Sequence, residues 1–318
     1  MSKRVSVSIT TYNHEKYIAQ AVESALNQKV NFSYEIVIGE DCSTDRTRQI
    51  VVALKDAHPE KIRLLLHEKN LGRWGKFNFV ETLKACQGEY IALLDGDDYW
   101  TDPNKLQRQV DFLESHSECS ICFHDVTLFY EDGTPAATSG GTSNKDIFTI
   151  EDLLTGNFMF ACSVVFRRGL FGEFPDWFYD SKMGDWALHL LNAQHGKVGH
   201  LKEVMAVYRV HEGGFWTSQN QLEQAKDQVQ ILDHLVNQLD DKYKRKARVA
   251  RANSWQHLSE AYFQRSEIAN ARRSLLKSLR ICLSNKSIPN RQLLGRLIKL
   301  QTYISYEWLR LRFTRVVS

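Results

Sequence analysis

Three carboxylates stand at the end of one short apolar run. Residues 90–94 have the pattern of a fully buried strand, and Asp95, Asp97 and Asp98 follow it, spaced around Gly96. In open α/β sheets, ligands bind beyond the carboxyl ends of the strands. Proteins usually hold Mg²⁺ or Mn²⁺ with one or two carboxylates plus the phosphate oxygens of a nucleotide. We therefore expect Asp97 to bind a divalent cation and Asp95 to reach a ribose or the water shell of the metal.

The same turn has a simpler explanation. Asp is a common helix cap, and a helix is expected to begin near Pro103, so the acids also fit a capping role. Other nucleotide chemistries are easier to exclude. The chain has no Walker-type Gly-Lys-Ser/Thr loop, and no Gly-x-Gly-x-x-Gly follows its first strand. These absences argue against a kinase and against a nicotinamide-dependent enzyme.

Strands and helices alternate through the first hundred residues and would position these acids. We predict strands at residues 5–10, 34–39 and 62–67 and a fourth that begins at Tyr90. Three helices separate them: one at 15–28, one that begins after a cap at Ser43 or Thr44, and one at 73–87. This alternation indicates an α/β protein with a mostly parallel, doubly wound sheet. The loops that follow the strands should then meet at one edge of the sheet; they are residues 10–13, 40–45, 70–76 and 95–100.

Three of these loops carry motifs that resemble a known family. They are Thr-Thr-Tyr-Asn at 10–13, Glu-Asp-Cys-Ser-Thr-Asp at 40–45 and Asp-Gly-Asp-Asp at 95–98. Together, and in this order, they resemble the family 2 inverting glycosyltransferases, which have the GT-A fold and assemble bacterial surface polysaccharides. The resemblance spans about residues 4–215. It implies a UDP- or dTDP-sugar donor and a saccharide or polyprenyl-linked saccharide acceptor.

The resemblance also implies roles for individual residues. Asp41 would accept the N3–H of uracil, and a carboxylate there selects uracil or thymine because cytosine offers an acceptor at that ring position. The other implied contacts are Thr10 and Tyr12 beside the base, Asp95 with Gly96 at the ribose, Arg73 or Lys76 near the nucleotide, and Asp97 on the metal. For Arg73 and Lys76, a solvated helix face is an equally good explanation.

Another acid, Asp185, lies further along the chain. The elements expected before it are a helix at 103–116, strand segments at 120–130 interrupted by His124 and Asp125, a Gly-rich acceptor-side loop at 133–146, a strand at 159–167 and an aromatic turn at 176–183. Asp185 opens the next helix and resembles the family's general base. In the family another acid usually precedes this base, whereas here Gly184 does. A carboxylate at a helix start is often only a cap, but we favour Asp185 as the base.

A last strand, predicted at 204–210, ends at His211. Neutral imidazole is a good ligand for Mn²⁺ and an acceptable one for Mg²⁺. By resemblance, His211 would complete the metal shell, or otherwise contact a phosphate, while the loop at Gly213 and Gly214 closes over the diphosphate. For His14, His67 and His124, we expect structural roles.

From residue 217 onward the pattern becomes helical and basic. Residues 241–318 hold 18 Lys and Arg against 4 Asp and Glu, a balance of +14; the remaining 23 basic and 34 acidic residues give −11 for residues 1–240. Trp255, Leu258 and Tyr262 resemble one tetratricopeptide-like hairpin. The pattern of residues 293–317 predicts an amphipathic helix, suited to an anionic membrane surface or docked with its basic side in water. No nucleic-acid module accompanies the charge, so we expect no nucleic-acid partner.

The composition is that of a soluble globular protein, with 43% apolar and 25% charged residues. The start of the chain has no signal-peptide pattern, so we expect a cytoplasmic protein, peripheral on the inner face of the plasma membrane if the basic helix binds there. Six cysteines are expected to be reduced thiols. Two alternatives to a transferase stay open: a non-catalytic nucleotide-sugar-binding scaffold, and a sugar-phosphate nucleotidyltransferase, whose basic Gly-rich triphosphate loop is missing here.

Overall fold

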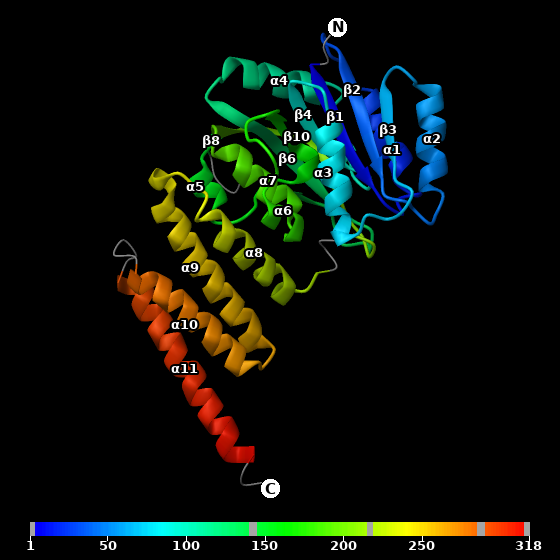
Figure 1. Cartoon of the computed structure of the whole chain (residues 1–318). Coiled ribbons are helices and arrows are strands. Elements are labelled where there is room, and N and C mark those ends of the chain that lie inside the picture. Colours follow the sequence, from blue (N-terminus) through cyan, green and yellow to red (C-terminus); the bar gives the residue numbers. More distant parts are fainter. Residues whose placement is uncertain (1–3, 140–144, 215–218, 285–289, 315–318) are drawn as a thin grey trace. The chain divides into compact units, whose positions relative to one another are not determined.

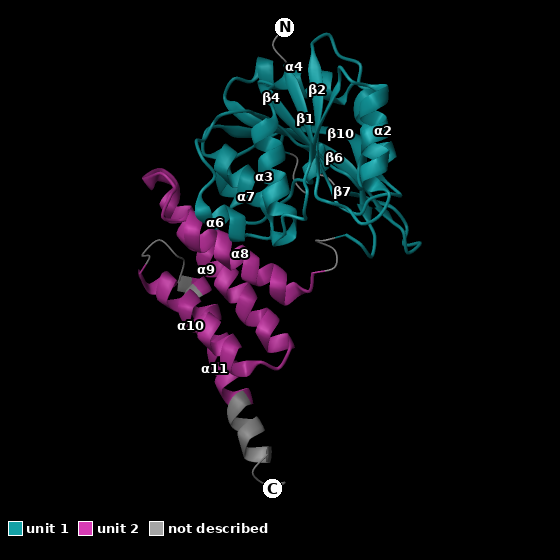
Figure 2. Ribbon diagram, turned by 45° about the vertical axis from the view of Figure 1, so that its right-hand side comes forward, with its two compact units in different colours: residues 1–218 teal, residues 219–318 magenta. Residues whose placement is uncertain are grey.

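The computed structural model describes residues 4–139, 145–214, 219–284 and 290–314. The chain forms two compact units, Met1–Ser218 and Gln219–Ser318, which Figure 2 distinguishes by colour. The sequence places the boundary between an α/β part and a basic helical part at residues 216 and 217. The two divisions differ by two residues.

In the described part of unit 1, ten strands form one mixed sheet with the order β3-β2-β1-β4-β9-β6-β10-β5, while β7 pairs with β6 and β8 with β10. The strands are β1 (Val5–Thr11), β2 (Tyr34–Glu40), β3 (Ile62–Leu66), β4 (Tyr90–Asp95), β5 (Tyr99–Trp100), β6 (Cys119–Tyr130), β7 (Ala137–Ser139), β8 (Ile147–Phe148), β9 (Val165–Arg167) and β10 (Lys197–Val210). The first four are parallel, as predicted. Strand β9 is antiparallel to both β4 and β6, and β10 is parallel to β6.

Helices cover this sheet (Figure 1). They are α1 (Ile18–Leu26), α2 (Thr47–Ala57), α3 (Lys76–Ala85), α4 (Lys105–Ser115), α5 (Ile150–Leu153), α6 (Asp176–Asp180) and α7 (Gly184–Ala193), with 3-10 turns at Arg73–Gly75 and Ala161–Ser163. Helices α1 and α4 share the main core cluster with every second residue of β1. Helix α3 contacts β1 and β2, and its Asn78 amide donates to the carbonyl of Gly39 at 2.8 Å. The strand ends therefore lie between helices that fix their position.

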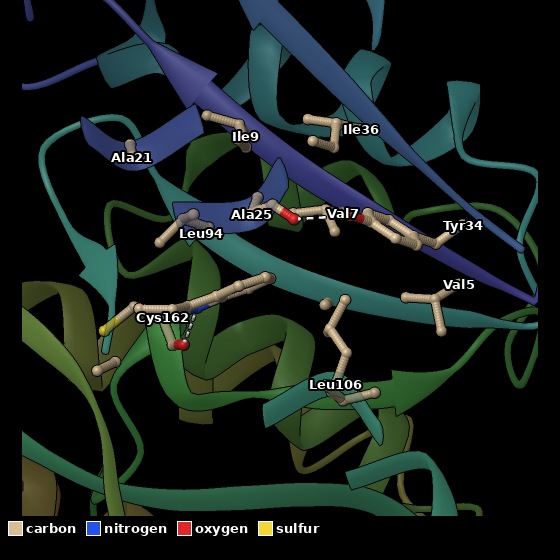
Figure 3. Packing of buried hydrophobic residues seen from close by; sticks show 14 of the residues in the cluster. Val5, Val7, Ile9, Ala21, Ala25, Tyr34, Ile36, Leu94, Leu106 and Cys162 are labelled. Carbon is tan, nitrogen blue, oxygen red and sulfur yellow. Dashed lines mark hydrogen bonds between the residues drawn. The ribbon is translucent and has the colours of Figure 1, made fainter. Parts of the chain in front are cut away.

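The core explains why apolar and polar residues alternate along β1. Val5, Val7 and Ile9 are fully buried, and each contributes about 1.5–3 kcal/mol by leaving water. Figure 3 shows how polar groups inside this cluster are satisfied. The Tyr34 hydroxyl donates to the carbonyl of Ala25 at 3.1 Å, and the indole N–H of Trp100 donates to the carbonyl of Cys162 at 2.8 Å. The six cysteines are free thiols, as expected.

The predicted cap of the second helix is wrong. Helix α2 begins at Thr47, and the side chain of Asp45 accepts from its backbone N–H at 2.9 Å. Ser43 and Thr44 are used elsewhere, because the Ser43 hydroxyl accepts from the Asn13 N–H and the Thr44 N–H donates to the Asn13 side chain. These contacts join the loop after β1 to the loop after β2.

Other differences fall in the second half of unit 1. Residues 120–130 form one continuous strand, because all of β6 pairs with β10. The strand predicted at 159–167 is only β9, since a 3-10 turn precedes it, and β10 begins at Lys197 rather than 204. The expected turn at 176–183 contains helix α6. The polar loop at 133–146 includes the short strand β7; its residues 140–144 lie outside the described part of the chain.

Unit 2 is helical, with α8 (Gln221–Leu235), α9 (Asp241–Gln264), α10 (Ile268–Ser284) and α11 (Asn290–Thr314). Helices α9 and α10 form the predicted hairpin, in which the Ser259 hydroxyl donates to the carbonyl of Ala271 at 2.8 Å. Helix α11 packs against α10. Within the described residues, no helix has both the length and the apolar composition needed to cross a membrane.

Candidate active site

The loops after β1, β2 and β4 meet at one edge of the sheet. Thr10 pairs with Gly39 of β2 on one side and with Asp95 of β4 on the other. Its hydroxyl donates to the Asp95 carboxylate at 3.1 Å, and its carbonyl accepts from the Gly96 N–H at 2.9 Å. The Asp41 N–H donates to the carbonyl of Thr11 at 3.1 Å. Parallel register thus brings together residues that are 85 positions apart in sequence.

Asp41 is a buried carboxylate, with 1% of its surface exposed. Burial raises its pKa, although the Leu71 backbone N–H, which donates to its Oδ1 at 2.8 Å, acts in the opposite direction. The Asn70 side chain donates to the Asp41 carbonyl at 3.0 Å, so the loop after β3 supports the loop after β2. Tyr12, which the sequence places beside the base, is 41% exposed.

Asp97 lies in a cluster with two histidines. Its Oδ2 is 3.1 Å from Nε2 of His211 and 3.8 Å from Nε2 of His14. Burial by itself would raise the pKa of Asp97, but the His211 hydrogen bond and the charges of both histidines lower it overall. The pKa of His211 is raised, first by its hydrogen bond to Asp97. The two histidines therefore favour the ionised form of this carboxylate, whose side chain is 19% exposed.

His14 belongs to this cluster, whereas the sequence analysis gave it a structural role. The Thr11 hydroxyl lies 3.3 Å from its Nδ1, which leaves Nε2 facing Asp97. Gly96 makes room for the ring, since a Cβ there would come within 2.8 Å of both His14 Nδ1 and Thr11 Oγ1. His67 and His124, in contrast, contact Asn78 and the Asp125 carbonyl respectively.

The third acid of the turn, Asp98, does not face the cluster. Its Oδ1 accepts from the Arg209 backbone N–H at 2.9 Å, and burial raises its pKa well above the usual range. The Arg209 guanidinium donates to the carbonyl of Asp97 and lies 4.6 Å from the ring centroid of Tyr99. These contacts tie the end of β10 to the turn after β4. They explain how His211, two residues further on, reaches Asp97.

Asp185 is the second residue of α7 and is held by a residue that the sequence analysis missed. The Asn157 side-chain amide donates to Asp185 Oδ2 at 2.8 Å, and Asn157 Oδ1 accepts from the Met159 N–H at 3.2 Å. Asp185 also lies close enough to Asp95 to affect it: burial, Asp97 and Asp185, in that order, raise the pKa of Asp95 to about 7. An asparagine in an irregular loop carries no sequence signal for such a role.

The two basic candidates have different environments. Arg73 is half exposed and forms an ion pair with Asp180 of α6. Lys76 is 3% exposed, and its ammonium lies 4.7 Å from the ring centroid of Phe178. Gly184, the residue before Asp185, leaves space for this ammonium, because a side chain at position 184 would collide with the Lys76 Nζ. The solvated-face explanation is therefore wrong for Lys76.

The chemistry of the cluster fits a divalent cation. Among the described residues, no three His, Cys, Asp or Glu side chains are already arranged as a complete metal shell. Asp97 and His211 do, however, provide an ionised oxygen and an imidazole nitrogen directed at each other, with a second imidazole nearby. Oxygen and nitrogen donors of this kind suit Mn²⁺, and a diphosphate would supply the remaining ligands.

Comparison with known proteins agrees with this geometry. The sequence model of glycosyl transferase family 2 matches residues 6–173, so the chain belongs to that family. It is 38% identical over 214 residues to an uncharacterised protein of Mycobacterium tuberculosis, and the match covers 67% of this chain and 61% of that protein. It is 34% identical over 215 residues to the Escherichia coli UDP-Glc:alpha-D-GlcNAc-diphosphoundecaprenol beta-1,3-glucosyltransferase WfaP, covering 66% of this chain and 78% of WfaP.

Solved structures show the same fold. Staphylococcus aureus TarS 1-349 in complex with UDP-GlcNAc superimposes with a TM-score of 0.65 at 20% identity, over 87% of this chain and 81% of that one. Mannosyltransferase PcManGT from Pyrobaculum calidifontis, in complex with GDP-Man and Mn²⁺, gives 0.58 at 17% identity, over 96% and 83%. The chain thus has the GT-A fold, with a helical C-terminal region, as predicted.

Proposed function

We propose that this protein is an inverting, metal-dependent glycosyltransferase that moves one sugar from a UDP- or dTDP-sugar to a hydroxyl of a saccharide or lipid-linked saccharide. The observation that carries the proposal is the meeting of Asp41, Asp95 and Asp97 at one sheet edge, with Asp185 close enough to raise the pKa of Asp95. Residues 1–216 would form the catalytic domain and residues 217–318 a helical extension.

In the proposed reaction, Asp185 removes the proton of the acceptor hydroxyl. The acceptor oxygen bonds to the anomeric carbon while the bond from that carbon to the phosphate oxygen breaks, and UDP leaves with the electron pair. Asn157 holds Oδ2 of Asp185 and thereby orients the carboxylate for proton transfer through Oδ1. Attack from the face opposite the leaving group inverts the anomeric centre.

The nucleotide would be held by the loops described above. Asp41 would accept the N3–H of the base, with Thr10 and Tyr12 beside it, and Asp95 with Gly96 would contact the ribose. The buried Lys76 ammonium and Arg73 would face the negative charge of the diphosphate. Asp97 and His211 would hold Mn²⁺ or Mg²⁺, which when bound supplies positive charge against the departing diphosphate.

Relatives support the biological setting. WfaP is named for transfer from UDP-Glc to a diphosphoundecaprenol-linked sugar, and TarS has been solved with UDP-GlcNAc. By analogy, we propose a role in cell-surface polysaccharide synthesis, at the cytoplasmic face of the plasma membrane. Nothing in the geometry described above favours the two alternatives, a nucleotide-sugar-binding scaffold and a nucleotidyltransferase.

The test compares turnover with binding. Asp185→Asn should reduce UDP release from a UDP-sugar and a lipid-linked saccharide acceptor by about 10²–10⁴-fold while leaving UDP affinity nearly unchanged. Asp111→Asn, a change at an exposed acid of α4, serves as the matched control and should behave as wild type. An equal loss of UDP affinity and turnover in Asp185→Asn would make Asp185 a structural residue instead, and turnover that survives in Asp185→Asn would remove it as the base.

A further inference from the structure

Exposed apolar side chains gather on two helices of unit 2. Of the twelve large apolar side chains that are exposed in the described residues, seven lie on α10 and α11. We call them the apolar face: Leu276, Leu283, Leu294, Leu297, Ile298, Ile304 and Tyr306. Leu283 is 69% exposed, and Leu294 and Ile298 are each 59% exposed. Clusters of this kind on a folded protein mark an interaction surface.

Helix α11 packs on α10 with apolar and basic side chains together, and its Tyr303 is 5% exposed in a cluster with Ala271 and Leu275. Arg296 is 2% exposed and donates to the Ser278 hydroxyl of α10 at 2.8 Å, while Lys299 forms an ion pair with Glu260 of α9. Leu294, Leu297 and Ile298, at helical i, i+3, i+4 spacing, are exposed on a different side. A helix docked only for stability would place its basic side in water and its apolar side inward. Here Tyr303 packs inward while Leu294, Leu297 and Ile298 face outward, so docking within the protein accounts for only part of the apolar surface of α11.

The charge around the apolar face has one sign. Residues 268–306, which include all of α10 and the described side chains of α11, contain no Asp or Glu. Among the described side chains of these helices, four cations are exposed: Arg273, Lys277, Arg280 and Arg291. The face therefore combines exposed leucine and isoleucine with positive charge, and residues 268–306 contribute no carboxylate to it.

The combination of exposed apolar side chains and positive charge indicates what kind of partner covers the apolar face. If a second copy of the chain covered the face through a two-fold contact, the same patch would meet itself and bring these cations close together. An anionic bilayer offers an apolar layer beneath negatively charged headgroups, which matches both properties of the face.

We propose that the α10–α11 face docks on an anionic membrane surface. The leucine and isoleucine side chains enter the boundary between headgroups and acyl chains, and Arg273 and Arg280 lie at lipid phosphates. This proposal is independent of the reaction at the acidic cluster, because it uses none of the residues there. It assigns to unit 2 the task of holding the protein at a lipid surface.

The test is co-sedimentation of the full chain with vesicles of phosphatidylcholine, with and without phosphatidylglycerol. Wild type should bind only the mixed vesicles strongly. Leu297→Gln with Ile298→Gln, and separately Arg273→Gln with Arg280→Gln, should each lower that affinity by about tenfold or more. All four side chains are exposed, so the variants should unfold at the wild-type temperature.

Matched changes in unit 1 serve as controls. Leu66→Gln removes an exposed leucine, and Lys29→Gln with Lys84→Gln removes two exposed cations; both should bind vesicles as wild type does. Equal binding by the two face variants and wild type would overturn the proposal. So would a concentration-dependent dimer that Leu297→Gln with Ile298→Gln abolishes, because the face would then belong to a contact between copies.

Discussion

In the proposed reaction, Asn157 prepares Asp185 for proton transfer. A carboxylate near the start of a helix can rotate freely unless a neighbour fixes it. Here the Asn157 amide donates to Oδ2, and a backbone N–H holds Asn157 in turn. The hydrogen bond thus fixes one carboxylate oxygen through a neutral partner.

We therefore expect Asn157→Ala to lower the turnover number by about 10–100-fold with UDP affinity unchanged, because only the orientation of the base is lost. The measurement is UDP release at saturating donor, with UDP binding followed by calorimetry. Asn104→Ala, at the N-terminal end of α4, is the control. A large fall in UDP affinity would assign Asn157 to nucleotide binding.

Gly96 offers a second prediction at this scale. Gly96→Ala would force a Cβ against His14 and Thr11, shifting the ring away from Asp97. We expect Mn²⁺-dependent UDP affinity to fall by about tenfold, measured by calorimetry with and without Mn²⁺. Gly172→Ala, where a Cβ meets nothing within 4 Å, should leave the affinity unchanged. Wild-type Mn²⁺ dependence in Gly96→Ala would show that His14 is not part of the metal shell.

At the scale of elements, buried Lys105 at the start of α4 controls a pH response. Its Nζ has no hydrogen-bond partner in the described residues and lies 4.0 Å from the ring centroid of Trp100. Burial lowers its pKa to about 7, against about 10.4 in an unfolded chain. Between these values the unfolded chain binds the extra proton, so this residue makes folding stability rise with pH from 7 toward 10.

Lys105→Met removes that dependence. The variant should exceed wild type in free energy of unfolding by a few kcal/mol, roughly 2–4, near pH 6, and the gain should shrink as the pH rises toward about 10. Urea unfolding at several pH values measures this. Lys84→Met, at an exposed lysine of α3, should show no such trend. A gain that is the same at all pH values would mean that Lys105 is uncharged throughout.

The elements also show what the sequence reveals and what it hides. The alternation of Val5, Val7 and Ile9 and the acids after Leu94 are local patterns, so the parallel half of the sheet and the meeting of its loops at one edge were predictable. The roles of His14 and Asn157 depend on partners 83 and 28 positions away in sequence, which no local pattern encodes. The start of α2 was misplaced for the same reason: Ser43 and Thr44 serve a contact with Asn13.

At the scale of the whole molecule, the two units carry opposite net charge. Unit 2, residues 219–318, holds 19 Lys and Arg against 8 Asp and Glu, a balance of +11, and the remaining 22 basic and 30 acidic residues give −8 for residues 1–218, so unit 2 is the part attracted to an anionic surface. Raising the salt concentration from about 0.1 M to about 0.5 M should therefore weaken binding to phosphatidylglycerol vesicles several-fold. Co-sedimentation at both concentrations measures it, and a salt-independent affinity would leave only the apolar contacts.

The central claim is that Asp41 and Asp97, on different loops, hold the two ends of one ligand. Calorimetric titration of UDP, with and without Mn²⁺, into wild type, Asp41→Ala and Asp97→Ala tests it most directly. We predict that Mn²⁺ strengthens UDP binding to wild type, that Asp41→Ala weakens binding in both conditions, and that Asp97→Ala removes the Mn²⁺ effect. UDP binding that is indifferent to Mn²⁺ and to both substitutions would contradict the account.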